Sequence, residues 1–385
     1  MSNWLAFAIF FSTITGLYGG AHYYIYKWFV RLAAPPFSWR RVVFGLFIFM
    51  VASFPVARVL SGYGFNAFSY LLTLISSVWM GLALYFFLCA LGCNLILGIL
   101  KLLPIDPQIF GSHPIFYQRI LFMSIIVAVF LIGGWALREA SNIRVTRLEI
   151  PLRGLPPEMD GMTLVQASDI HYGMLVTSDR LAKIVEQINA LQPDMVVITG
   201  DLVDEGVDHM EEMAIPLSRI QSRQGVFAIT GNHEFYAGVQ RAVAIMQGAK
   251  IKVLRNELVV LPSGLQILGM EDPTAYRMGE PKPDFSRLFA RLNPQAPAIL
   301  LYHQPLMLAP ADSTKWGLQL SGHTHGGQLF PIRYISRLFY PYGPGLHSLA
   351  EGFLYVSWGA GTWGPPMRLM APPELVCIRL RSPRA

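Results

Sequence analysis

The stretch TLVQASDIH, residues 163–171, is an apolar run of strand length that ends in polar residues. The stretch MVVITGD, residues 195–201, repeats this pattern, and residues 178–190 between the two have helical spacing. Strands that alternate with helices favour an α/β domain. Because parallel strands end at one edge of a sheet, the polar residues that follow these runs are expected to lie close together.

The alternation continues along the C-terminal half of the chain. Helices are predicted at 178–190, 209–219 and 239–247 by their apolar spacing. Strands are predicted at Val145–Ile150, Thr163–Ala167, Met195–Thr199, Val226–Thr230, Gln266–Gly269, Ala298–Tyr302, Leu318–Ser321, Phe353–Val356 and Val376–Arg379.

Five of these strands deliver carboxylate, amide or imidazole groups where they end. The groups lie in Ser168-Asp169-Ile170-His171, Gly200-Asp201, Gly231-Asn232-His233-Glu234, His303 and Gly322-His323-Thr324-His325-Gly326-Gly327. Residues two apart on extended backbone point the same way, which pairs Asp169 with His171 and His323 with His325. Imidazole and carboxylate ligands suit Mn, Fe or Zn, and a carboxylate such as Asp201 can bridge two metals.

The N-terminal half has a different composition. The whole chain is 53% hydrophobic and 14% charged, whereas soluble domains carry about 25% charged residues. Residues 1–137 hold one acidic and seven basic residues, so all of the formal charge of +6 lies there. Basic residues between apolar runs orient membrane proteins, so nucleic-acid binding is not expected. Four spans are predicted: Trp4 to about Tyr26, Val42–Leu60, one within Phe68–Leu103, and about Ile115–Leu137.

Basic residues also predict the orientation. Four of them lie between the first two spans and two between the last two, but only Arg58 lies between the second and third. The positive-inside rule therefore places the first and third connections in the cytoplasm. The part of the chain after the fourth span is then expected outside the cell membrane, on the periplasmic side of a bacterial inner membrane.

The five motifs together resemble those of the calcineurin-like metallophosphoesterase superfamily, and the layout resembles transmembrane members with such a domain. The resemblance covers about residues 155–380. It implies two mixed β-sheets packed as a sandwich and flanked by helices, behind a multi-pass α-helical membrane region. The domains expected are a membrane domain at 1–140, a connecting strand and linker at 141–162, and a catalytic domain at 163–385.

The resemblance also implies roles for residues of this chain. One divalent metal is held by Asp169, His171 and His325, and another by Asn232, His303 and His323, with Asp201 bridging the two. The metals share a hydroxide that attacks phosphorus, and His233 contacts the phosphate or protonates the leaving oxygen. The reacting centre is therefore expected to comprise Asp201, Asn232 and His233.

The expected function is a membrane-anchored phosphohydrolase that acts on a phospholipid or a lipid-linked phosphate or diphosphate. The alternatives are a transmembrane sensor or transporter-like module regulated by its phosphoesterase domain, and a non-catalytic metal-binding scaffold. The expected partners are the lipid bilayer and the phosphorylated substrate, and no protein partner can be inferred. The substrate preference depends on an apolar lip formed by aromatic residues around 329–342 and 353–363, which ordinary loop packing explains equally well.

Several residues near the motifs have two interpretations. Asp204 either orients a histidine or caps a helix. Glu234 is more typical of a solvated turn residue than of a functional one. Arg333, Arg337 and Arg368 either bind a second phosphate or headgroup, or form surface salt bridges.

Overall fold

The computed structural model describes residues 3–61, 67–100, 102–103, 114–306 and 316–383. Contacts within the chain divide it into two compact units, Met1–Ala136 and Leu137–Ala385. The sequence predicts the end of the membrane domain at residue 140, four residues after the first unit ends.

The first unit is helical, as its uninterrupted apolar runs predict. Its helices are α1 (Asn3–Ala33), α2 (Phe37–Ser61), α3 (Ala67–Leu100) and α4 (Pro114–Ser141), of which α4 continues into the second unit. Among the described residues, three segments are long and apolar enough to cross a membrane, at Phe37–Ala57, Ala67–Leu100 and Phe116–Ser141. The expected first span, Trp4 to about Tyr26, lies within α1, but its early side chains are outside the described residues.

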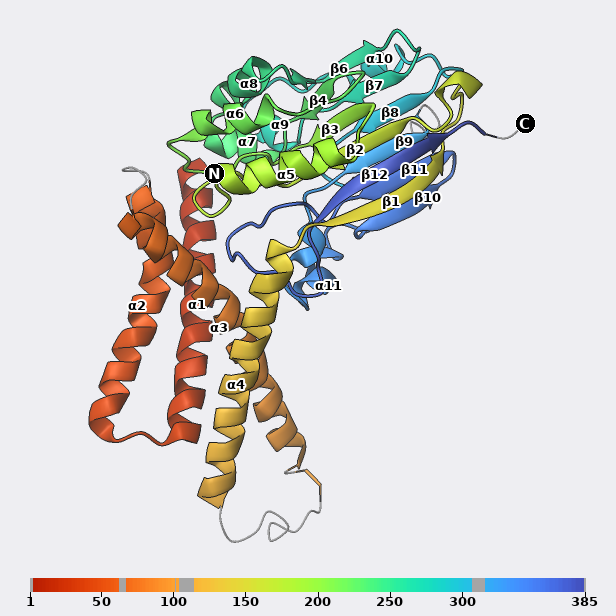
Figure 1. Cartoon of the computed structure of the whole chain (residues 1–385). Coiled ribbons are helices and arrows are strands. Elements are labelled where there is room, and N and C mark those ends of the chain that lie inside the picture. Colours follow the sequence, from red (N-terminus) through yellow and green to blue (C-terminus); the bar gives the residue numbers. More distant parts are fainter. Residues whose placement is uncertain (1–2, 62–66, 101, 104–113, 307–315, 384–385) are drawn as a thin grey trace. The chain divides into compact units, whose positions relative to one another are not determined.

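The second unit contains two six-stranded mixed sheets (Figure 1). The first sheet has the order β1-β12-β2-β3-β4-β5, and the second has the order β10-β11-β9-β8-β7-β6. The strands of the first sheet are β1 (Arg144–Pro151), β12 (Glu374–Arg381), β2 (Thr163–Ala167), β3 (Met195–Thr199), β4 (Val226–Ile229) and β5 (Lys252–Val253). Those of the second are β10 (Gly345–Leu349), β11 (Gly352–Val356), β9 (Leu318–Ser321), β8 (Ala298–Leu301), β7 (Gln266–Gly269) and β6 (Glu257–Val260).

Alternate residues of these strands face opposite sides of their sheet. On β3, Met195 and Val197 join a core shared with Ile299 and Leu318 of the second sheet. Burying an aliphatic side chain of this kind stabilises a fold by about 1.5–3 kcal/mol, so the shared core holds the two sheets face to face. This confirms the predicted sandwich of mixed sheets.

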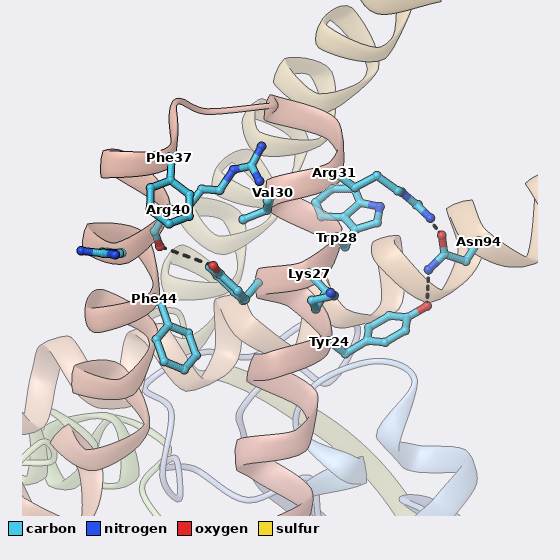
Figure 2. A pocket seen from close by; sticks show the side chains of 11 residues that line it. Tyr24, Lys27, Trp28, Val30, Arg31, Phe37, Arg40, Phe44 and Asn94 are labelled. Atoms are coloured by element: carbon cyan, nitrogen blue, oxygen red, sulfur yellow. Dashed lines mark hydrogen bonds between the residues drawn. The ribbon is translucent and has the colours of Figure 1, made fainter.

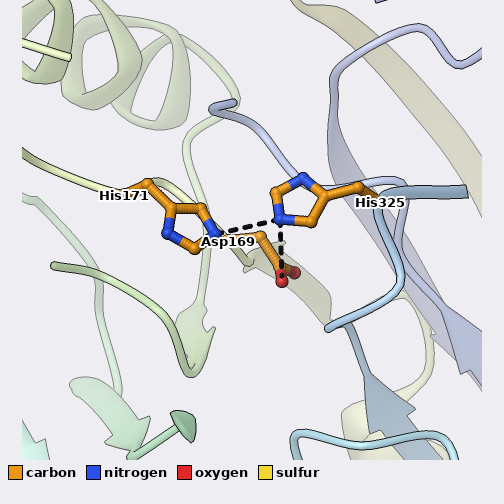
Figure 3. Close-up of side chains that lie close together, drawn as sticks. All are labelled: Asp169, His171 and His325. Carbon is orange, nitrogen blue, oxygen red and sulfur yellow. Dashed lines mark hydrogen bonds and ion pairs between the residues drawn. The ribbon is translucent and has the colours of Figure 1, made fainter. Parts of the chain in front are cut away.

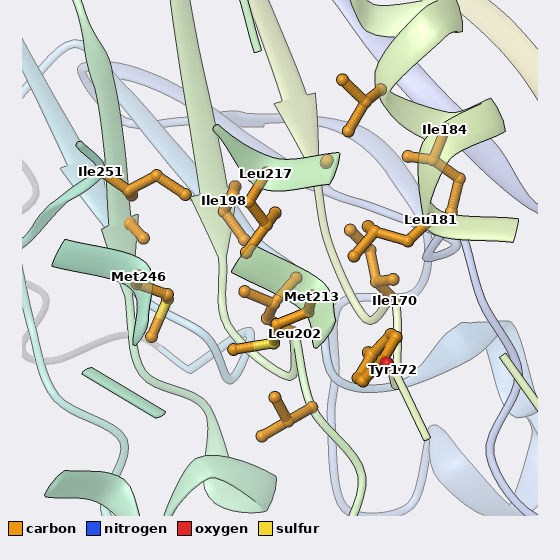
Figure 4. Close-up of a cluster of buried hydrophobic side chains, with 14 of the residues drawn as sticks. Ile170, Tyr172, Leu181, Ile184, Ile198, Leu202, Met213, Leu217, Met246 and Ile251 are labelled. Carbon is orange, nitrogen blue, oxygen red and sulfur yellow. The ribbon is translucent and has the colours of Figure 1, made fainter. Parts of the chain in front are cut away.

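The other side of the first sheet is covered by helices. Val196 and Ile198 of β3 pack with Leu181 and Ile184 of α5 (Ser178–Ala190) and with Met246 of α8 (Val239–Gly248) (Figure 4). The i, i+3 spacing of the two α5 residues places both on one helical face. The helices thus seal one face of the sheet and leave the strand ends free to carry polar groups.

Three parts of the domain differ from the sequence prediction. The expected helix over 209–219 is instead a 3₁₀ turn, Met210–Met213, followed by the short helix α6 (Ala214–Leu217). The strands β5, β6 and β10 and the short helices α7 (Asn232–Ala237), α9 (Thr274–Arg277), α10 (Phe285–Phe289) and α11 (Ile332–Ser336) were not expected. They are too short to show a sequence period, and their positions depend on tertiary pairing.

Candidate metal centre

The predicted site residues follow β2, β3, β4, β8 and β9 directly, and several of them have strained backbone. Asp169, His171, Asp201, His323 and His325 all have positive φ, between 48° and 73°. For a non-glycine residue this conformation costs about 1–2 kcal/mol. Such strain persists where the surrounding structure enforces it, and it is typical of functional sites. The five strained residues at neighbouring strand ends therefore indicate that this edge of the two sheets is the functional site.

Two glycines allow the loops that carry these residues to approach closely. A Cβ atom at Gly231 would lie 2.2 Å from Asp201 Oδ1, and one at Gly322 would lie 2.2 Å from Asp169 Oδ2. Both contacts are far shorter than van der Waals distance. The glycines beside the motifs are thus required by the close approach of backbone to carboxylate.

One group of side chains consists of Asp169, His171 and His325 (Figure 3). The Nε2 atoms of the two histidines are 2.9 Å apart, and His325 Nε2 is 3.6 Å from Asp169 Oδ1. All three residues are buried, and the figure shows them converging on one another. The structure thus brings together three side chains that could hold one metal.

A second group consists of Asp201, His303 and His323. Asp201 Oδ2 is 3.1 Å from His303 Nε2 and 3.9 Å from His171 Nε2 of the first group. His323 Nδ1 is 3.2 Å from His303 Nε2. Asp201 thus lies between the two groups, where a bridging carboxylate is expected.

The hydrogen bonds around the second group fix which ring nitrogen of His303 faces the centre. Its Nδ1 is 2.7 Å from the Thr199 carbonyl oxygen, which can only accept, so Nδ1 carries the hydrogen. When the ring is neutral, the Nε2 lone pair therefore points to Asp201 and His323.

The orientation of His323 follows from a longer chain of hydrogen bonds. Gln304 Nε2 donates to both carboxylate oxygens of Asp272, at 2.8 and 3.1 Å, and Gln304 Oε1 accepts from Tyr340 Oη at 3.3 Å. Tyr340 Oη, 2.7 Å from His323 Nε2, must therefore accept from that nitrogen. The Nδ1 lone pair of His323 then faces the centre as well.

With both rings neutral, two nitrogen lone pairs and a carboxylate oxygen therefore converge in this second group. Acceptors in such an arrangement have no hydrogen to share, and buried acceptors without a donor are costly. A cation among them removes the conflict, and nitrogen with carboxylate oxygen is a donor set that binds divalent transition metals. The residues of this chain therefore fit the metal that the sequence motifs imply.

Asn232 and His233 lie at the start of α7. The Asn232 Oδ1 atom is buried and has no hydrogen-bond partner in the described part of the chain, as an oxygen directed at a metal would be. His233 packs edge-on against the His171 ring at 4.6 Å between centroids. Its Nδ1 is 2.7 Å from Glu205 Oε2 and 3.2 Å from Asp204 Oδ1. Of the two interpretations of Asp204, the structure favours orientation of a histidine.

The pKa values of the site are shifted in opposite directions. Burial, together with nearby His233 and His303, lowers the pKa of His171 to about 3, and burial together with His303 lowers that of His323 to about 4. Burial also opposes protonation of His233, but Asp204 and Glu205 outweigh it and raise the pKa to about 11. Groups with pKa values driven apart in this way are typical of reacting centres.

One residue of each group, Asp169 in the first and His303 in the second, has a raised pKa. Burial raises the pKa of Asp169 to about 6. Burial lowers the pKa of His303, but Asp201 outweighs it and raises the value to about 10. A proton on His303 therefore satisfies the acceptors that a metal would otherwise satisfy.

Glu234 is not the solvated turn residue that the sequence favoured. It is fully buried, and its carboxylate accepts from the backbone N–H groups of Asp201, Leu202, Val203 and Gly231 at 2.6–3.2 Å. These bonds fix the loop after β3 against the start of α7. The solvated-turn interpretation was wrong because the local sequence does not show that three N–H groups of that loop, and that of Gly231, need an acceptor.

Arg368 is likewise neither a surface residue nor a free phosphate ligand. It is fully buried, and its five N–H groups are directed to the Gly361, Trp358 and Ala371 carbonyl oxygens and to His325 Nδ1. Arg368 Nη2 is 3.0 Å from His325 Nδ1, so the ring hydrogen of neutral His325 lies on Nε2 and faces the His171 lone pair. The first group is thus hydrogen-bonded within itself, and a metal there must replace that hydrogen.

We expect Arg368→Met to destabilise the domain by about 3 kcal/mol or more, because three buried carbonyls lose their charged donor. The measurement is thermal or denaturant unfolding of the detergent-purified chain in the presence of a chelator. The matched control is Arg223→Met, which removes an exposed arginine paired with Asp194 and should cost less than about 1 kcal/mol. Equal effects of the two substitutions would contradict the structural role of Arg368.

Sequence reasoning missed two contacts of the site and left another feature open. Glu205 was not identified, although it directly follows Asp204 in the sequence, and Tyr340 was expected only as part of the apolar lip. Of the aromatic lip, Tyr334, Phe339 and Trp363 are 52%, 72% and 51% exposed, and Leu338 between them is 80% exposed. Tyr340 instead contacts His323, and the Trp363 ring lies 5.9 Å from that of His233.

Comparison with known proteins agrees with the motifs. The family model of the calcineurin-like phosphoesterase matches residues 162–327. An uncharacterised metallophosphoesterase of Campylobacter jejuni is 31% identical over 388 residues, covering 98% of this chain and 100% of that protein. The zebrafish (Danio rerio) transmembrane protein with metallophosphoesterase domain is 34% identical over 325 residues, covering 81% of this chain and 74% of that protein.

Other relatives are matched over less of their length. An uncharacterised metallophosphoesterase of Helicobacter pylori is 36% identical over 221 residues, which is 57% of this chain and 60% of that protein. The solved structure of a 5'-nucleotidase precursor from Thermus thermophilus overlaps with a TM-score of 0.35 at 15% identity, over 56% of this chain and 54% of that chain. At that level the structural match bears on neither substrate nor mechanism.

Proposed function

This chain belongs to the calcineurin-like phosphoesterase family, and we propose that it is a membrane-anchored phosphohydrolase that works with two divalent metals. The observation that carries the proposal is the position of Asp201 between two groups of convergent acceptors. A single-metal site would not need a second group, and a structural zinc site would use thiolates. Among the described residues, no cysteine belongs to either group.

The two groups would hold the metals as the motifs imply. Asp169, His171 and His325 would hold one, Asn232, His303 and His323 the other, and Asp201 would contact both. Bound metals supply Lewis acidity at the phosphoryl oxygens and lower the pKa of water toward about 7. Imidazole with carboxylate favours Mn, Zn or Fe over Mg or Ca.

His233 would supply the proton that the reaction needs. The carboxylates of Asp204 and Glu205 lie at its Nδ1, so its Nε2 hydrogen is directed away from them, and a ring nitrogen of His233 lies within 4.8 Å of ligand atoms of His171 and Asp201. From there His233 can donate to a phosphoryl oxygen or protonate the leaving oxygen. A positioned proton donor of this kind contributes about 10²–10⁴-fold.

Tyr340→Phe tests whether the hydrogen-bond chain to Asp272 positions His323 as a ligand. Without the tyrosine oxygen, neither tautomer of His323 is preferred. We expect affinity for one of the two metals to fall about 10–100-fold, as on loss of other hydrogen bonds to metal ligands. Metal content after dialysis against limiting metal checks this, with Tyr342→Phe as the control. Two metals retained with unchanged affinity would contradict the role of Tyr340.

We further propose that the substrate is a phospholipid or a lipid-linked phosphate or diphosphate. Exposed apolar side chains at Leu338 and Phe339 continue directly into Tyr340, which contacts His323. Trp363, half-exposed, flanks His233 from another loop. Apolar surface beside a polar centre favours a substrate with both an acyl chain and a phosphate.

The test compares a soluble with a bilayer-presented substrate for the same protein. Wild-type protein in nanodiscs is offered bis(p-nitrophenyl) phosphate, and phosphatidic acid in the same bilayer. Leu338→Glu should impair hydrolysis of the lipid and leave that of the soluble ester unchanged, whereas Val260→Glu, at an exposed apolar position of β6, should affect neither. Turnover of soluble esters alone would overturn the lipid assignment and leave the phosphohydrolase intact.

We also propose that the chain resides in the cell membrane, the inner membrane of a bacterium, with its catalytic unit on the outer side. The support is the excess of basic residues between the first two spans and between the last two. A reporter fused after Ala385 should be active only if it functions outside the cytoplasm. Cytoplasmic reporter activity would reverse the orientation.

A further inference from the structure

The membrane unit contains a cavity of about 710 Å³ among α1, α2 and α3 (Figure 2). Four cationic residues line it: Lys27, Arg31, Arg40 and Arg41. Aromatic side chains, among them Trp28, Phe37 and Phe44, form much of the remaining wall. Its size lies within the range of small-molecule sites. The catalytic mechanism uses none of these residues.

The three arginines of this cavity have neutral partners. Arg31 donates to Asn94 Oδ1, and Asn94 in turn donates to the Tyr24 hydroxyl (Figure 2). Arg40 Nε donates to the Pro35 carbonyl at 3.2 Å, and the Arg41 guanidinium lies 4.9 Å from the centre of the Phe37 ring. Residues 1–105 contain no aspartate or glutamate. Four positive charges therefore share one cavity, and that stretch supplies no carboxylate to balance them.

An anion is the ligand that this charge requires. Uncompensated charge beside membrane-spanning helices is costly, and a bound counter-ion relieves the repulsion among like charges. Guanidinium groups match the oxygen geometry of phosphate and bind it through paired hydrogen bonds. Three arginines on one cavity thus favour phosphate over a halide or a carboxylate metabolite.

The cavity also lies at the end of a candidate span. Phe37 is the first residue of the span Phe37–Ala57, and Arg40 and Arg41 follow it within one helical turn. The end of a span lies at the lipid headgroups, where aromatic and basic residues gather. Basic pockets between such helices on the cytoplasmic side bind anionic headgroups. The apolar wall suits the acyl chains that accompany a lipid phosphate.

We propose that this cavity binds the phosphate-bearing headgroup of an anionic phospholipid. The proposal is independent of the phosphohydrolase activity, because its residues belong to the membrane unit and its ligand need not be a substrate. The chain would then contact lipid in two ways. The membrane unit binds a headgroup through charge, and the catalytic unit offers apolar surface.

The test is native mass spectrometry of the full chain in detergent, with phosphatidylglycerol and phosphatidylcholine as competing probes. Wild-type protein should retain phosphatidylglycerol preferentially. Arg40→Gln or Arg41→Gln should each weaken retention about fivefold, since one basic residue near a lipid headgroup contributes about 1 kcal/mol. Arg41→Lys should keep part of the preference, which separates loss of charge from misfolding.

The matched control is Arg119→Gln, an exposed arginine of α4 that does not line the cavity. It should leave the retention unchanged. Equal retention of the two lipids by the wild type, or equal losses in Arg41→Gln and Arg119→Gln, would overturn the site. Displacement of the lipid by inorganic phosphate at physiological concentration would also overturn it, since the cavity would then recognise a free anion.

Discussion

Replacing Asp201 with asparagine is expected to abolish turnover and to reduce the metal content below two per chain. The carboxylate lies 3.1 Å from His303 Nε2 of the second group and 3.9 Å from His171 Nε2 of the first, so it can reach both metals. Asparagine keeps the volume but removes the charge that balances two cations. Loss of one preorganised electrostatic group already costs about 10²–10³-fold in rate, so we expect a loss of at least about 10³-fold.

The measurement for Asp201→Asn combines metal analysis with initial rates on bis(p-nitrophenyl) phosphate. The control is Asp208→Asn, at an exposed aspartate seven positions further along the chain, which should behave as wild type. Asp201 Oδ1 also accepts from the His233 N–H at 2.9 Å, and asparagine oxygen can keep that bond, so the loop should stay in place. Two metals and unimpaired turnover in the variant would refute the bridging position.

Replacing His233 with glutamine should separate catalysis from metal binding. In the proposed arrangement His233 touches the phosphate and no metal, so the variant should keep two metals, although its unfolding temperature should fall because Asp204 and Glu205 lose their cationic partner. The rate should fall about 10²–10⁴-fold, the usual contribution of a positioned acid. Glu205→Gln, which leaves the ring but weakens its orientation, should give a smaller loss in kcat.

The control for His233→Gln is His209→Gln, a histidine that lies outside both ligand groups. It should leave rate and metal content unchanged. Loss of a metal from His233→Gln would instead make His233 a ligand, since one of its nitrogens lies within 4.8 Å of ligand atoms of His171 and Asp201. His233 would then be assigned as a metal ligand and no longer as the proton donor.

The fold and the strand-end residues were predictable because each depends on a short stretch of sequence. The strands β2, β3, β7 and β9 match their predicted bounds, and all of their residues except Thr163 are buried. Since parallel strands end at a common edge, the motifs identified Asp169, Asp201 and His303 without any tertiary information.

The residues that were missed or misread depend on contacts between distant segments. Tyr340 reaches His323 from a loop 17 positions later, and Arg368 reaches His325 across 43 positions. Glu234 lies within a motif, but its role depends on N–H groups some 30 residues away. No local period or spacing encodes such pairings. The basic cavity was not predicted for the same reason, because residues from the facing sides of three helices form it.

The central claim is that one chain needs two metals for phosphoryl hydrolysis. The most direct measurement strips the detergent-purified chain of metal, adds back Mn, Zn or Fe in steps, and follows rate and bound metal together. The account predicts turnover that rises only as the second equivalent binds and that is lost in Asp201→Asn. Full turnover at one equivalent, or two bound metals with no turnover of any ester or lipid phosphate, would contradict it.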